Sequence, residues 1–183
     1  MQKFIIQIEE ENFVWPEDKN LECFLLSNDL SASFKADFAL KAKKNGKIVL
    51  GFSADDCLSY QLDGVLLDLS KSENIKKDYQ SGAENLKNKI VGAICRNRRH
   101  EAMLVSECEP DFVVFKAWAD GAEKVKELTA WYAEMFLIQS ALLPVDEVDY
   151  SAFKTDFVIL SDRKYVKKYL QNENDSCMLR RIK

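Results

Sequence analysis

Eight short runs of apolar, β-branched and aromatic residues recur along this 183-residue chain. Each run is nearly continuous rather than alternating, which is typical of strands that are covered on both faces, as in parallel sheets. Charged stretches with helical spacing separate the runs, as repeated strand–helix units require. The runs are residues 4–8, 23–27, 48–52, 64–69, 90–95, 111–115, 136–139 and 156–160. Eight such units predict an α/β fold, a closed parallel TIM (β/α)₈ barrel.

The chain is short for such a barrel, which ordinarily needs roughly 200 residues or more. We therefore expect a trimmed barrel that forms one domain over residues 1–183. Residues 9–22, between the first two runs, include Trp15 followed by Pro16 and show no helical period. Because proline breaks helices and the period is missing, the first crossover helix is expected to be short or absent.

Two of the other intervening segments carry clear helical patterns. Residues 31–45 place Phe38 on an apolar face and end just before Gly46, a residue suited to a helix C-terminus. Residues 122–134 show an apolar stripe opposite a charged face, as an outer barrel helix should. The tail from Tyr165 also predicts a final helix.

Composition narrows the function classes. The net charge of −4 argues against a nucleic-acid partner, because phosphate neutralisation usually needs a basic face. No window approaches the ~18 apolar residues of a membrane span, and the N-terminal apolar run is too short for a signal peptide, so we expect a cytoplasmic protein with no membrane contact. The lone His100 completes no typical zinc site with the five cysteines, which are expected to be reduced. These cysteines are Cys23, Cys57, Cys95, Cys108 and Cys177.

In a parallel barrel the carboxyl ends of the strands converge on one rim, so polar residues just after each run can meet there. This rim is the predicted site, and its mixture of carboxylates and cations suits a small anionic or phosphorylated ligand, with or without Mg²⁺. The candidate ligand contacts are Asp68, Lys71, Arg96, Arg98, Lys116, Ser140 and Arg163, with Asp68 as the candidate metal ligand.

Structural explanations compete with these assignments. Loop ends are polar in any barrel, and for Lys116 the two interpretations balance, because it interrupts an apolar run and lies two residues before Trp118. Asp55, Asp56 and Asp162 fit helix N-cap patterns better than a site. The segments after the last two runs lack the glycines that usually cradle phosphate in barrels, which argues against a standard phosphate cradle.

Four segments resemble the thiamine-phosphate synthase superfamily, which includes TenI-like proteins. They are LDGVLL (62–67), IVG (90–92), HEA (100–102) and PDFV (110–113), in the order of that family's DGVHL strand, IGVS strand, EA-containing helix and GADYVGFGP strand. The resemblance spans roughly residues 21–165. It implies a TIM barrel and a transferase of thiamine biosynthesis, which joins a pyrimidine diphosphate to a thiazole phosphate with Mg²⁺ and releases pyrophosphate.

The functional positions of that family are replaced here. Where the family has QLREK, this chain has FLLSN (24–28), and where the family has HLGQ, this chain has LLDL (66–69). The family's GFGP is replaced by VFKA (114–117), and the position of the serine in its GVS is occupied by Ile94. No catalytic residue carries over, so we expect a divergent barrel that binds a phosphorylated ligand without ordinary synthase activity.

Two alternatives stay open. One is a non-catalytic barrel that acts as an interaction or oligomeric subunit, a homo-oligomer included, through Trp118 and Trp131. The other is a different phosphosugar-binding barrel enzyme resembling phosphoribosylanthranilate isomerase, although the GGL-type glycines of that family are missing too.

Overall fold

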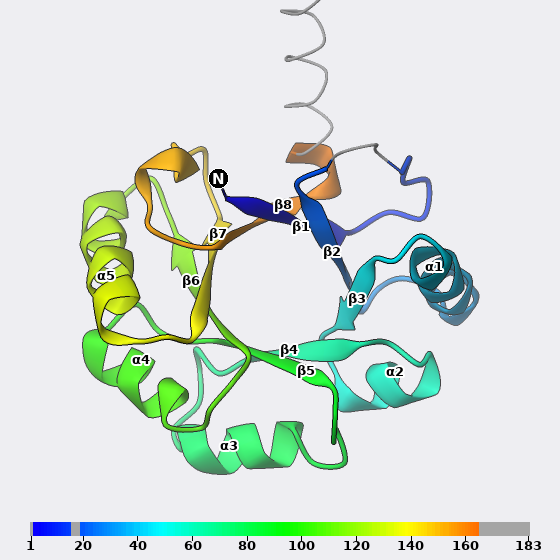
Figure 1. The fold of residues 1–183 in the computed structure, drawn as a ribbon, viewed down its shortest axis with the longest axis horizontal. Helices are drawn as coiled ribbons and strands as arrows, with labels where there is room; N and C mark the ends of the chain where they lie inside the picture. The colour runs from blue at the N-terminus through cyan, green and yellow to red at the C-terminus, as the bar shows by residue number, and fades with distance from the viewer. Residues whose placement is uncertain (1, 16–18, 165–183) are drawn as a thin grey trace, which may run out of the picture.

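The computed structural model describes residues 2–15 and 19–164, which form a closed barrel of eight parallel strands (Figure 1). Each strand pairs with the next, and β8 pairs with β1, so the ring has no open edge. The predicted barrel is therefore confirmed. The strands are β1 (Lys3–Ile8), β2 (Leu21–Leu26), β3 (Ile48–Gly51), β4 (Gly64–Asp68), β5 (Ile90–Ile94), β6 (Phe112–Ala117), β7 (Gln139–Pro144) and β8 (Phe157–Ser161).

Helices surround the ring on its outer side (Figure 1). They are α1 (Ala32–Lys44), α2 (Ala54–Ser59), α3 (Ile75–Gly82), α4 (Arg99–Ser106), α5 (Ala122–Met135) and the 3₁₀ turn η1 (Tyr150–Ala152). The expected helices over 31–45 and 122–134 are thus confirmed, and Gly46 has the positive φ of +64° that ends α1. The helix predicted from Tyr165 lies outside the described residues.

The described residues between β1 and β2 contain no helix, as the sequence predicts. Aromatic side chains fill the place of the missing helix. The Trp15 ring lies 4.5 Å from the Phe24 ring of β2 and stacks at 5.3 Å on the Phe38 ring of α1. This cluster covers the outer face of β2, so the trimmed crossover still buries its strand.

Side chains that alternate along the strands form two separate apolar cores. One lies between strands and helices, and Phe24, Phe115 and Tyr132 are fully buried in it. The other fills the barrel. Its buried members are Ile5, Cys23, Leu25, Leu50, Leu66, Ile94, Phe112, Val114, Ala141 and Ile159.

Three aspartates tie the strands together at their amino ends. Each stands immediately before an even-numbered strand, and its N–H donates to the carbonyl of a residue near the start of the preceding strand. Its carboxylate accepts the N–H of that same residue at 2.7 or 2.8 Å. These pairs are Asp63 with Val49, Asp111 with Val91, and Asp156 with Ser140.

The seventh strand corrects the sequence prediction, which placed it at 136–139. It starts at Gln139 and runs to Pro144, because Phe136 and Ile138 pack instead against the outer core beside the end of α5. Ser140 therefore lies at the amino end of β7, buried, with its N–H held by Asp156. Its predicted place on the carboxyl rim is wrong.

We expect Asp63→Ala to lower the free energy of unfolding by about 1–3 kcal/mol, because it leaves the buried Val49 N–H without its acceptor. Chemical denaturation near neutral pH measures this change. The matched control is Asp37→Ala on the exposed face of α1, which should leave stability unchanged or slightly raised, since alanine is the better helix former. Equal losses in both variants would contradict the role given to the aspartates.

Candidate functional site

The carboxyl ends of the strands surround the mouth of the barrel. Every second side chain of a strand points into the barrel. The residue two positions after a buried inward-facing residue therefore lies at the mouth. We call these eight positions the mouth ring: Gln7, Ser27, Phe52, Asp68, Arg96, Lys116, Leu143 and Ser161. All are at least partly exposed, whereas the layer beneath them is buried, so the ring is the solvent boundary of the barrel interior. Phe52 and Leu143 pack on the interior core and give the mouth an apolar part.

An ion pair joins two members of the mouth ring across β5. The Lys116 ammonium lies 2.9 Å from Oδ2 of Asp68, although β4 and β6 are not neighbours. Ile94 explains the contact, because it pairs in register with both Asp68 and Val114, and Lys116 follows Val114 by two residues. The lysine side chain is 22% exposed and the aspartate side chain 45%. The sequence thus predicted two residues that the fold brings together.

Hydrogen bonds set the charge of Asp68. Its Oδ1 accepts the backbone N–H of Ser70 at 3.0 Å and the hydroxyl of Ser70 at 2.5 Å. Partial burial opposes ionisation, but the bonds from Ser70 and Lys116 together outweigh it and hold the pKa of Asp68 below its usual value. Asp68 is therefore ionised at neutral pH.

Asn97 fixes the backbone beside this pair. Its Nδ2 donates to the Lys116 carbonyl at 2.6 Å, so the side chain connects the end of β5 to the end of β6. Its Oδ1 is buried and has no hydrogen-bond partner in the described structure. Asn97 therefore positions Lys116 from the backbone side.

Arg96, another predicted ligand contact, binds groups of the chain itself. Its Nε and Nη2 donate to the carbonyls of Ser70 and Ser72 at 2.8 Å each, and Nη1 lies 3.2 Å from a Glu101 carboxylate oxygen. All three guanidinium nitrogens thus have acceptors within the chain. The contacts hold the loop after β4, so Arg96 supports the mouth from within the chain.

The remaining predicted cations lie on the outer rim. Lys71 and Arg98 are exposed, and Arg163 is exposed and paired with Glu10. The buried Asp162 accepts the N–H groups of Glu9 and Glu10 through Oδ2 and so fastens the loop after β1. The Ser161 hydroxyl accepts the Lys164 N–H, which supports the N-cap expectation for this Ser-Asp pair.

The N-cap expectation near Asp55 and Asp56 is supported, since the Ser53 hydroxyl accepts the Asp56 N–H and Asp56 binds the buried Lys35 at 2.7 Å. Gln7 and Leu143 were missed as mouth residues. Counting every second residue along the first run would have found Gln7, whereas Leu143 lies beyond the seventh run as it was predicted, at 136–139.

Mg²⁺ does not fit the donor set of this mouth. Among the described residues there is no group of three His, Cys, Asp or Glu side chains that could hold a metal ion. Asp68, the candidate ligand, already engages Ser70 through one oxygen and the Lys116 ammonium through the other. A divalent cation would have to compete with that ammonium for Asp68.

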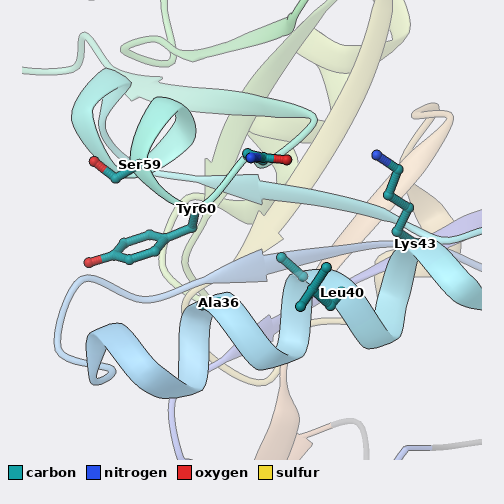
Figure 2. A pocket seen from close by; sticks show the side chains of 7 residues that line it. Ala36, Leu40, Lys43, Ser59 and Tyr60 are labelled. Carbon is teal, nitrogen blue, oxygen red and sulfur yellow. The ribbon is translucent and has the colours of Figure 1, made fainter.

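Hollows elsewhere on the molecule are distinct from the mouth. A hollow of about 190 Å³ lies between α1 and the end of α2, where Leu40 and Tyr60 line it (Figure 2). A second, of about 290 Å³, lies between the start of α5 and η1. A larger one, of about 370 Å³, opens at the amino ends of the strands. In the described ranges, no helix is long and apolar enough to span a membrane.

The Asp68–Lys116 pair predicts a pH-dependent coupling in a double-mutant cycle of Asp68→Asn and Lys116→Met. At neutral pH we expect a coupling of about 0.2–1 kcal/mol, because both side chains are partly exposed. The folded-state pKa of Asp68 is lowered, so this contribution is present above the unfolded-state pKa and is lost as pH falls through the lowered value. Chemical denaturation at several pH values measures it. A coupling that persists after Asp68 is protonated would contradict the ion pair.

Comparison with known proteins identifies the fold and nothing finer. No protein-family model and no curated protein matches the chain. Among solved structures, a variant of the citrate synthase SbnG is similar, with 12% identity, a TM-score of 0.57 and coverage of 98% of this chain and 95% of that one. Orotidine 5'-monophosphate decarboxylase from Methanocaldococcus jannaschii, complexed with the inhibitor BMP, is similar with 15% identity, a TM-score of 0.54 and coverage of 88% and 89%. The chain therefore shares the TIM-barrel fold of these proteins.

Proposed function

We propose that the mouth of the barrel binds a small phosphorylated molecule, with Lys116 as its principal contact. The observation that carries this proposal is the inward-facing ammonium of Lys116, which is mostly shielded from solvent and bound to a half-exposed carboxylate. A phosphate group offers more negative charge and more acceptor oxygens than Asp68, so it can compete for the ammonium. Lys71 and Arg98 add exposed positive charges at the rim, where they favour the approach of an anion.

The rest of the mouth ring indicates what the phosphate would be attached to. Phe52 and Leu143 supply apolar surface on the interior core, and Gln7, Ser27 and Ser161 supply hydrogen-bonding groups. Such a combination suits a ring compound that carries one phosphate. The resemblance to thiamine-phosphate synthases makes a thiazole phosphate or a pyrimidine phosphate the first ligand to try.

The proposal concerns binding alone. In it, Asp68 is the partner of Lys116 until a ligand binds. Asp68 holds the ammonium in the mouth while the site is empty, and the ligand phosphate replaces it. Ser70 then keeps the released carboxylate in place through its N–H and hydroxyl. No side chain is assigned a bond-making step, because the positions that carry chemistry in the resembled family hold other residues here.

A second candidate function rests on exposed apolar side chains. Met135 is 62% exposed and Leu137 is fully exposed beside the end of α5, while Trp118 is 42% exposed near the mouth. Large apolar side chains on a surface favour protein association. The barrel would then act as an interaction or homo-oligomeric subunit. Sedimentation velocity separates the two functions, since a strictly monomeric protein at all concentrations would rule out the homo-oligomer.

Thermal unfolding in the presence of thiazole phosphate, pyrimidine phosphates, pyrophosphate and sugar phosphates tests the binding proposal. A ligand at about 100 times its Kd should add about 2.7 kcal/mol to the free energy of unfolding. We expect Lys116→Met to lose this stabilisation in buffer with EDTA and in buffer with Mg²⁺ alike.

The matched control is Lys126→Met, which removes an exposed ammonium on α5, outside the barrel. That variant should keep the stabilisation. If no phosphorylated compound stabilises the native protein, or if Lys116→Met responds as strongly as the native protein, the mouth is not the binding site.

A further inference from the structure

We propose that the opposite, amino end of the barrel is a second binding site, for an uncharged and largely apolar small molecule about the size of a fused two-ring compound. This site uses none of the residues of the mouth ring, and it does not depend on the function proposed for the mouth.

The site is the hollow of about 370 Å³ that opens at the strand starts. Its walls are apolar side chains of the barrel interior, with two aromatic rings among them. These are Ile5, Cys23, Ile48, Leu50, Ile90, Phe112 and Phe157. The hollow exceeds the ~150 Å³ of an engineered cavity that binds benzene, and it lies within the usual range of ligand pockets, about 300–1,000 Å³. A molecule larger than one ring therefore fits.

Small residues explain why the barrel is open here. A barrel interior is normally filled by layers of four bulky side chains from alternate strands. The lowest inward positions of the even-numbered strands are Cys23, Gly64, Phe112 and Phe157. Gly64 contributes no side chain, because a Cβ there would lie 2.0 Å from the Ile90 carbonyl oxygen, and Cys23 contributes a short one. Two of the four positions in this layer therefore leave space that a bulky side chain would fill.

The entrance indicates that the ligand carries no charge. Lys3 and Glu22 stand at the edge and neutralise each other across 2.8 Å. The Asp111 carboxylate is bound to the Val91 N–H. A charged ligand would lose its hydration among the apolar walls. Among the described residues of the entrance only Asp111 carries a charge without an ion-pair partner, and it is exposed, so water screens it.

One polar side chain remains to orient a ligand. Gln139 lines the entrance and is exposed, so its amide is available to exchange a hydrogen bond with a single polar group. The thiol of Cys23 is not a reactive group here, because burial raises its pKa far above the usual value. The site is thus suited to reversible binding of a compound such as indole, with an apolar body and one N–H group.

Methyl NMR of the full chain, labelled at the isoleucine δ1 methyl groups and titrated with indole, tests the proposal. We expect saturable shifts at Ile48 and Ile90, which line the hollow, and none at Ile75 of α3, which lies in the outer core. Absence of saturation up to the solubility limit of indole, or shifts that spare Ile48 and Ile90, would overturn the site.

Two variants check the place and the chemistry. Cys23→Leu pushes extra methyl groups into the hollow and should weaken indole binding by about tenfold or more. Gln139→Leu changes an exposed residue, so the fold should persist. It should weaken indole binding by about fivefold, which is the effect of one lost hydrogen bond, and it should leave benzene binding unchanged.

Lys116→Met is the matched control at the mouth and should leave the affinity for indole unchanged. A Gln139→Leu variant that binds indole as tightly as the native protein would refute the polar contact. Loss of indole binding in Lys116→Met would refute the independence of the two ends.

Discussion

The parallel pairing of β8 with β1 is the constraint on which the rest of this structure depends. Closure gives every strand two partners and fixes the register around the ring, so the same alternate residues of each strand must point inward. Both the mouth ring and the hollow at the other end follow from this closure of the barrel. A slip of one residue in β6, for example, would turn Lys116 toward the helices and bring the buried Phe115 into the barrel.

The fold was predictable because burial on both faces leaves a simple trace in the sequence. Strands covered by helices outside and by side chains inside have no polar face, so they read as continuous apolar runs, and seven of the eight runs match the strands closely. The seventh did not, because an apolar run also arises where Phe136 and Ile138 cover the end of a helix. The polar Gln139 and Ser140 begin β7, so its start lacks the apolar residues by which the other strands were found.

The site was predictable only in outline. The rule that strand ends meet at one rim found Asp68 and Lys116, but it could not separate Lys116 from Arg96, since both follow strands and both carry positive charge. The separation comes from long-range hydrogen bonds: Arg96 contacts carbonyls of Ser70 and Ser72, whereas Lys116 contacts a side chain. Those contacts depend on the path of the loop after β4, which no short pattern in the sequence specifies.

The two ends of the barrel use aspartate for opposite purposes. At the amino end, Asp63, Asp111 and Asp156 bind backbone N–H groups, which are fixed donors, so these carboxylates hold the strands in register. At the carboxyl end, Asp68 binds the tip of a long lysine side chain, which can move without disturbing the strands. The exchange of partners that we propose at the mouth would therefore cost little of the stability that the amino end supplies.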